Sequence, residues 1–212
     1  MFKSDFPLSP RKTAKQERSR RKAEHILDTT LALLAEGQGD RVTTKMIAQR
    51  AEISIGNLYQ FYPNKEALFY DLFQRWMERV IAALNRLEDT LHAADPAERV
   101  PLFLAGILND IGGDAELNGA GHWALRSVME RSPELSQVSL QHNERFLSSL
   151  DALRYLCVAE GTSDPAPEIK LLQSQITAAC LYVMSTTQDK FRRDNVREQS
   201  KKLMLQSLFL NE

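Results

Sequence analysis

The sequence predicts an all-α protein. Apolar residues recur at spacings of three and four along the segments, no segment alternates with period two, and glycine and proline signals separate the segments. The chain has 212 residues with 43% hydrophobic content and no internal repeat. This length is sufficient for one large or two small domains, each with a buried core.

The N-terminal part of the chain is predicted to contain an arm followed by a helix. Residues 1–14 hold two prolines and little apolar pattern, which is typical of a flexible arm. A helix is expected from Lys15, and Gly37 and Gly39 end it. Its apolar positions recur at three and four: Ala23, Ile26, Leu27, Thr30, Leu31 and Leu34. Its start is dense in positive charge, with Arg18, Arg20, Arg21 and Lys22.

This basic helix start has two interpretations. Positive charge near a helix N-terminus opposes the helix dipole, which favours a phosphate partner. A solvated helix start is the alternative.

Residues 43–66, with Val42 leading, are predicted to form two short helices joined by a tight turn. Thr43 or Thr44 can cap the first helix, and Ser54 can cap the second. Met46, Ile47 and Ala51 give the first helix an apolar face. Ile53 fills the turn. In the second helix we expect three side chains to point inward: Ile55, Leu58 and Tyr62. Three others are expected to stay exposed: Asn57, Tyr59 and Gln60. This is the helix-turn-helix plan, whose second helix enters the DNA major groove.

The rest of the chain is predicted to be a series of helices. A long one starts at Pro63-Asn64 and runs to Asp95-Pro96, which starts the next. Pro101 makes that helix begin late or bend, and residues 111–114 break it. The remaining helices are expected at about 119–131, from Ser132-Pro133 to Gly161, at 168–188 and at 194–210, with a linker over 162–167.

Charge is distributed unevenly along the chain. Residues 1–62 carry 11 Lys/Arg and 7 Asp/Glu, whereas residues 63–212 carry 16 and 21. A basic head on an acidic body is typical of a DNA contact confined to one end. Random surface charge is the alternative.

The helix-turn-helix segment resembles the DNA-binding signature of the TetR family of transcriptional regulators. The residues that carry the resemblance are Ile47-Ala48, Ala51, Ser54, Gly56, Leu58-Tyr59 and Asn64-Lys65-Glu66-Ala67-Leu68. The family's signature as a whole covers about a quarter of the chain. Glu52 stands where the family usually has a turn glycine, and Phe61-Tyr62 replaces the family's His/Tyr-then-Phe order. The resemblance implies a DNA-binding domain over 15–62 and a ligand-binding and dimerisation domain over 63–212.

The resemblance also implies which residues contact DNA. Thr44, Lys45, Tyr59 and Lys65 would bind phosphates, and helix N-termini do present free N–H groups to anions. Asn57 and Gln60 could bind adenine through paired hydrogen bonds, while Gly56 allows close backbone approach. An ordinary polar helix surface is the alternative. The complete set of candidates is Thr43, Thr44, Lys45, Ser54, Ile55, Gly56, Asn57, Tyr59, Gln60, Tyr62 and Lys65.

For the body, the resemblance implies a homodimer formed by the last two helices and a pocket for a small effector. Two apolar faces fit that dimer, although ordinary core is the alternative: Ile176, Ala179, Cys180, Val183 and Met184, and Leu203, Leu205, Leu208 and Phe209. The candidate pocket lining, each member of which could instead be core, is Trp76, Phe103, Ile107, His122, Trp123, Met129 and Phe146. His122 beside Trp123 could orient a ligand with one polar group.

Other classes of protein fit the sequence poorly. The four histidines share no metal-ligand spacing, and no phosphate loop or nucleophile elbow is present, so no enzyme, metal or cofactor is expected. Cys157 and Cys180 are expected to be buried thiols. No apolar run approaches the ~20 residues of a membrane span, so a cytoplasmic protein is expected. We predict a repressor that binds a palindromic operator and responds to a largely apolar ligand; a ligand-independent DNA-binding or architectural protein is the alternative.

Overall fold

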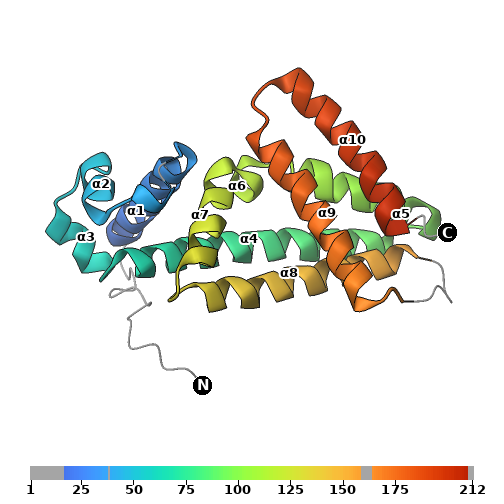
Figure 1. Ribbon diagram of the computed structural model, residues 1–212, viewed down its shortest axis with the longest axis horizontal. Coiled ribbons are helices and arrows are strands. Elements are labelled where there is room, and N and C mark those ends of the chain that lie inside the picture. Colours follow the sequence, from blue (N-terminus) through green and yellow to red (C-terminus); the bar gives the residue numbers. More distant parts are fainter. Residues whose placement is uncertain (1–16, 38, 159–163, 210–212) are drawn as a thin grey trace. The chain divides into compact units, whose positions relative to one another are not determined.

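The structure, a computed structural model, describes residues 17–37, 39–158 and 164–209 (Figure 1). All of the regular secondary structure in these residues is helical, which confirms the predicted all-α class. The predicted arm, residues 1–14, lies outside the described residues. The chain divides into two compact units: a first unit of Met1–Met77 with Ala120–Gln141, and a second unit of Glu78–Gly119 with His142–Glu212.

The first unit holds the helix-turn-helix segment. Its elements are α1 (Glu17–Ala35), the 3-10 turn η1 (Gly39–Arg41), α2 (Thr44–Arg50), α3 (Ile55–Phe61), the first part of α4 (Lys65–Ala93), α7 (Ala120–Arg131) and the start of α8 (Ser136–Cys157). Helix α1 packs against both α2 and α7. The core is formed by the apolar positions that the helical periodicity indicates, including Ile26, Leu34, Ile47, Leu58 and Leu68.

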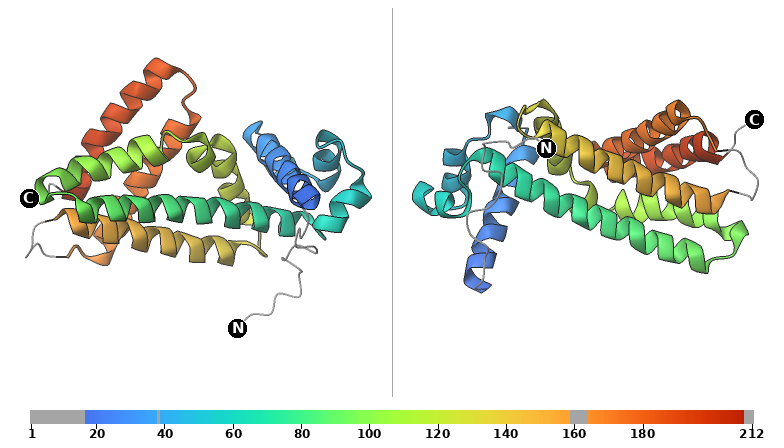
Figure 2. Two further views of the ribbon diagram at one scale, coloured as in Figure 1. Left: turned by 180° about the vertical axis from the view of Figure 1, so that it is seen from behind. Right: turned by 90° about the horizontal axis from the view of Figure 1, so that it is seen from below.

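The second unit is built from the remaining helices (Figures 1 and 2). Besides the rest of α4 and α8, it contains α5 (Pro96–Ala105), the π-helical segment η2 (Gly106–Ile111), α6 (Ala115–Asn118), α9 (Pro167–Thr186) and α10 (Lys190–Phe209). Helices α9 and α10 pack against each other, and α10 also contacts α5 and η2. The predicted domain boundary after residue 62 lies inside the first unit, and α4 contributes residues to both units.

Several helix boundaries differ from the prediction. Pro101 neither delays nor ends its helix, since α5 begins at Pro96 and continues into η2. The isolated turn α6 was not predicted. It forms because the Asp114 carboxylate accepts a hydrogen bond from the Glu116 N–H at 2.7 Å. Helix α8 begins at Ser136, after a turn, and its predicted end at Gly161 lies outside the described residues.

Candidate nucleic-acid interface

The turn between α2 and α3 is made by a non-glycine residue in a left-handed conformation. Glu52 has φ of 54°, and the Ile53 N–H that follows donates to the Ala48 carbonyl at 3.0 Å. This confirms the expectation that Glu52 takes the conformation for which glycine is usual. An L-residue there costs roughly 1–2 kcal/mol, so the surrounding packing must hold the turn in place.

Two side-chain caps define where the short helices begin. The Thr43 hydroxyl accepts a hydrogen bond from the Met46 N–H at 3.2 Å, so Thr43, and not Thr44, caps α2. The Ser54 hydroxyl accepts from the Asn57 N–H at 3.1 Å and caps α3 as predicted. Each cap satisfies one backbone donor that the helix itself leaves without a partner.

Helix α3 has one buried row and one exposed face. Leu58 and Phe61 are buried, whereas Gly56, Tyr59 and Gln60 are exposed. Ile55 is 42% exposed, so the expectation that it points inward is wrong. A helix of only seven residues buries one narrow row, and Ile55 lies outside that row.

Gly56 lies in open space on this face. A Cβ atom added there would have nothing within 4 Å, so packing inside the chain does not require glycine. A glycine inside a helix is destabilising by roughly 0.5–1 kcal/mol relative to alanine. The residue therefore fits a surface that another molecule approaches closely.

Tyr62 does not lie on the exposed face. Its side chain is 1% exposed, and its hydroxyl donates to Asp71 Oδ2 at 2.7 Å. Arg75 bonds both oxygens of the same carboxylate, at 3.0 and 3.2 Å. Burial raises the pKa of Tyr62, and the neighbouring carboxylate raises it further. Tyr62 thus fastens the end of α3 to α4, and we leave it out of the DNA-contacting set proposed below.

The other predicted phosphate binders surround α3. Lys45 is exposed at the start of α2, and Thr44 Oγ1 lies 3.1 Å from the Tyr59 hydroxyl. Lys65 begins α4, with its Nζ 5.7 Å from the centre of the Phe69 ring. These side chains come from the start of α2, the exposed face of α3 and the start of α4, as the helix-turn-helix plan implies.

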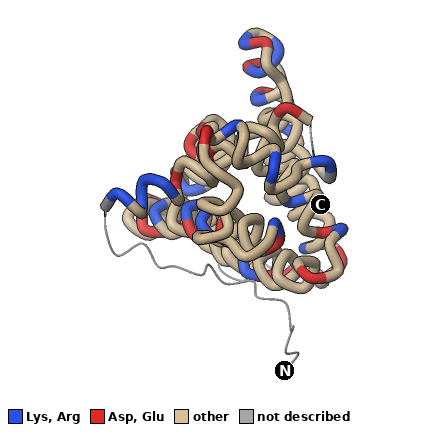
Figure 3. The backbone as a smooth tube through the Cα atoms, turned by 90° about the vertical axis from the view of Figure 1, so that its left-hand side faces the viewer, with Lys and Arg blue, Asp and Glu red and all other residues tan. Residues whose placement is uncertain are grey.

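The basic start of α1, for which the sequence favoured a phosphate partner, lies beside the turn of the helix-turn-helix. Lys and Arg gather at this end of α1 (Figure 3). Arg18, Arg21, Lys22 and His25 line a hollow together with Ile53 of the turn. Their spacing of three, one and three residues places them on one side of α1, and this periodicity is the signal that could have added His25 to the set.

The seven predicted ligand-lining residues are divided between the two units. In the first unit, the buried rings of Trp76 and His122 stack with centres 5.0 Å apart. Met129 is buried there, and the partly exposed Trp123 ring lies 5.6 Å from the Arg126 guanidinium. In the second unit Phe103 and Ile107 are buried, and Phe146 is partly exposed.

The second unit contains a cavity of about 260 Å³. Its walls come from α5, α8, α9 and α10, and Phe103 is the predicted residue that lines it.

A cap, a tight turn and a short helix with an exposed polar face define the helix-turn-helix class of DNA-binding proteins. Residues 26–72 match the family described as "Bacterial regulatory proteins, tetR family". This match, which covers the helix-turn-helix segment, confirms the resemblance to the TetR family seen in the sequence.

Two relatives match different lengths of the chain. The HTH-type transcriptional repressor KstR of Mycolicibacterium smegmatis is 33% identical over 93 residues, which are 44% of this chain and 44% of that protein. The chain thus matches less than half the length of this relative. The nucleoid occlusion factor SlmA of Vibrio vulnificus is 26% identical over 171 residues, covering 72% of this chain and 76% of that protein.

Solved structures share the fold over most of the chain. A TetR transcription regulator from Haloarcula marismortui has a TM-score of 0.67 at 19% identity, covering 89% of this chain and 97% of that one. FadR from Bacillus subtilis, solved in complex with stearoyl-CoA, has a TM-score of 0.58 at 18% identity and covers 89% and 99%. At these identities the likeness establishes the fold.

Within the described residues, none of the helices combines the length and apolar character that crossing a bilayer requires. Of the two cysteines, Cys180 is buried as expected, while Cys157 is partly exposed.

Proposed function

We propose that the protein is a transcriptional repressor that binds a palindromic operator as a homodimer and is released by a small, largely apolar effector. The observation that carries this proposal is the exposed face of α3 on a Ser54-capped helix. The match of residues 26–72 to the TetR family and the similarity to the repressor KstR support it. Its place of action would be the cytoplasm.

The proposed DNA-contacting residues, which come from α2 and α3 with their N-caps and from α4, divide by chemistry into two groups. Asn57 and Gln60 carry amides that can form paired hydrogen bonds with adenine, and Ile55 can contact a thymine methyl group. Thr43, Thr44, Lys45, Ser54, Tyr59 and Lys65 offer hydroxyls or ammonium groups for phosphates. The basic hollow at the start of α1 would add further phosphate contacts. Sequence choice would therefore come from the first group and overall affinity from the second.

Binding to duplex fragments from the region upstream of the gene tests this division. Fluorescence anisotropy at several salt concentrations should give a steep, linear fall of log affinity with log salt, because bound phosphates release counterions. Gln60→Ala should cost ~1–3 kcal/mol on the preferred fragment and little on random DNA. Gln49→Ala, an exposed glutamine on α2, is the matched control. Equal losses on both DNAs would contradict the assignment of Gln60.

Gly56→Ala separates a functional glycine from a structural one. Because the added methyl group meets nothing in the chain, the variant should fold at least as stably as the unaltered protein. It should nevertheless bind operator DNA more weakly, since the methyl group occupies space next to the groove. Unchanged affinity would show that DNA does not approach this face closely.

The proposed homodimer would use exposed apolar side chains on the last two helices. Tyr182, Val183 and Leu203 are each between 44% and 49% exposed, although large apolar side chains are usually buried. Leu203→Glu should yield monomers with weak operator binding, because a two-fold operator needs both recognition helices. Lys201→Gln changes the charge by the same amount on a different side of α10 and should stay dimeric. Light scattering on both variants measures this; a stable monomer of the unaltered protein would remove the premise.

The proposed effector site has two candidate locations. The predicted lining includes Trp76, His122 and Trp123, and the cavity lined by Phe103 offers a further place for a ligand. The fold shared with FadR, which was solved with stearoyl-CoA, supports ligand control. An effector acts only if it binds the DNA-incompetent state better, and such coupling is typically ~1–3 kcal/mol.

A second candidate function is a DNA-binding protein that needs no ligand. The match to the nucleoid occlusion factor SlmA supports an architectural role of this kind, since that protein is named for its action on the nucleoid and the match covers 72% of the chain, against 44% for KstR. A thermal-shift screen with small apolar compounds discriminates the two functions, since a ligand of the folded state raises its melting temperature. If bound compounds leave DNA affinity unchanged, the ligand-independent function is correct.

A further inference from the structure

The cavity of the second unit has an apolar wall and a charged end. Phe103, Leu147, Leu150 and Leu208 contribute apolar side chains from α5, α8 and α10. At the charged end, Arg154 of α8 and Lys170 of α9 line the same space. At ~30 Å³ for a water molecule, about 260 Å³ accommodates a compound of on the order of ten non-hydrogen atoms.

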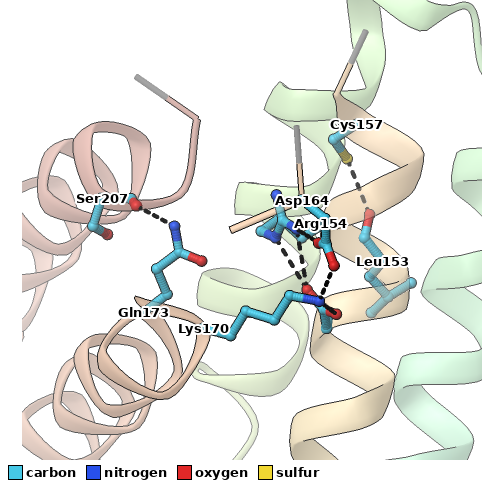
Figure 4. Close-up of polar contacts among 8 residues, drawn as sticks. Leu153, Arg154, Cys157, Asp164, Lys170, Gln173 and Ser207 are labelled. Carbon is cyan, nitrogen blue, oxygen red and sulfur yellow. Dashed lines mark hydrogen bonds and ion pairs between the residues drawn. The ribbon is translucent and has the colours of Figure 1, made fainter. Parts of the chain in front are cut away.

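The charged end is held together by two carboxylates. Arg154 Nε and Nη2 both lie 3.2 Å from Asp151 Oδ1, one turn earlier on α8. Lys170 Nζ lies 2.8 Å from Asp151 Oδ2 and 2.8 Å from Asp164 Oδ2. Figure 4 shows Arg154, Lys170 and Asp164 directed toward one another. The Arg154 side chain is only 5% exposed, so its charge requires a nearby anion.

The two carboxylates are held very differently. Asp151 receives hydrogen bonds from both cations, and although burial opposes its ionisation, these bonds lower the pKa of Asp151. Asp164 lies ahead of α9, its side chain is 61% exposed, and it is 3.5 Å from Arg154 Nη2. Asp164 is therefore the carboxylate that water and a competing anion reach most easily.

We propose that this cavity binds a small apolar monocarboxylate whose carboxylate replaces that of Asp164 between Arg154 and Lys170. The exchange leaves the charge of the cluster unchanged, because one carboxylate takes the place of another. Arginine is well suited to this role, since its planar donors match the geometry of a carboxylate. The apolar part of the ligand would cover Phe103 and the leucines, which adds burial of apolar surface.

A cationic ligand fits the cluster less well. It would have to displace Lys170 from two carboxylates at 2.8 Å each and leave Asp151 with fewer partners. The hydrogen bonds that Lys170 donates to Asp151 and Asp164 raise the pKa of Lys170, so this cation stays protonated at neutral pH. An anionic ligand displaces only the exposed Asp164.

Calorimetric titration of the full chain with octanoate, 1-octanol and octylamine tests the proposal. These probes share a chain of eight carbons and differ in the charge of the head group. Octanoate should bind at least ten-fold more tightly than either of the others. No octanoate binding at millimolar concentration, or equal affinity for octanol, would overturn the proposal, as would tighter binding of octylamine.

Two variants locate the carboxylate. Asp164→Asn removes the competing anion and should strengthen octanoate binding several-fold, whereas Glu168→Gln, an exposed neighbour outside the cavity lining, should not. Lys170→Met should weaken octanoate binding about ten-fold, and Lys190→Met, an exposed lysine on α10, is its control. Far-UV circular dichroism confirms that each variant is folded. An Asp164→Asn variant with unchanged affinity would refute the exchange.

As an account of the effector, this inference rests on the proposed function, but the two fail separately. Operator binding is measured without octanoate, and octanoate binding is measured without DNA. Loss of octanoate binding with intact operator binding overturns the ligand site alone. Octanoate binding with the predicted variant pattern, in a protein that shows no specific DNA binding, overturns the repressor alone.

Discussion

The buried hydroxyl of Tyr62 provides a direct test of how α3 is fixed. Tyr62→Phe removes the 2.7 Å hydrogen bond to Asp71 without creating a cavity. A hydrogen bond to a charged group contributes about 1.5–3 kcal/mol. Since Arg75 still bonds both Asp71 oxygens, the carboxylate keeps a partner and we expect a loss of about 1.5–2 kcal/mol. Urea unfolding at pH 7.5, followed by far-UV circular dichroism, measures this loss.

The same variant should also change the response to alkaline pH. The pKa of Tyr62 is raised in the folded protein, so the hydroxyl stabilises the fold fully below the ordinary tyrosine pKa of about 10. Above pH 10 the unfolded chain ionises first, and this stabilisation is lost at about 1.4 kcal/mol per pH unit. The stability difference between the unaltered protein and Tyr62→Phe should therefore shrink between pH 10 and 11.

A matched control is available on the same helix. Tyr59 is exposed, and its hydroxyl lies 3.1 Å from Thr44 Oγ1 at the surface. Tyr59→Phe should change stability by no more than about 0.5 kcal/mol, with no alkaline effect. If the two variants lose equal stability, or if the Tyr62→Phe difference is constant with pH, the Asp71 contact does not hold α3.

Three further predictions concern other parts of the chain. Glu52→Gly relieves the left-handed turn and should raise stability by about 0.5–1 kcal/mol, whereas Glu52→Ala should not; equal urea midpoints for the two would contradict the strain. Gly121→Ala places a Cβ 2.6 Å from the Leu31 carbonyl oxygen and should lower the free energy of unfolding by about 1–3 kcal/mol. If Gly121→Ala were as stable as Gly56→Ala, the packing of α1 against α7 would have to adjust without cost. Burial raises the pKa of Cys157 to about 11, so alkylation by iodoacetamide should be slow at pH 8 and accelerate toward pH 11; a rate at pH 8 matching that of free glutathione would disprove this.

The local signals in the sequence identified the helix-turn-helix well. Residues close in sequence determine the Ser54 cap, the turn at Glu52 and the burial of Leu58. The structure agrees with the prediction on each of these three features. Ile55 was misplaced because a seven-residue helix has room for one narrow buried row. Tyr62 is buried, as its expected inward position implies, but its hydrogen-bond partner Asp71 lies nine residues away on another helix, so the sequence alone did not remove it from the DNA candidates.

The cavity could not be predicted from the sequence in the same way. Its lining comes from four helices, and the cations that meet at its end, Arg154 and Lys170, are separated by a linker. Helical periodicity indicates which face of each helix is apolar, but not which faces meet. The short α6 was missed for a related reason, since one turn is too short to show periodicity.

The π-helical segment η2 affects how this chain compares with others. The Gly112 N–H donates to the Ile107 carbonyl at 2.9 Å, five residues back, so the segment holds one residue more than an α-helical turn. Without that residue, the end of the helix at Ile111 would be rotated by about 100° and the chain would leave it ~1.5 Å earlier along the axis. Alignment with a chain whose helix is regular therefore needs a one-residue gap between Gly106 and Ile111.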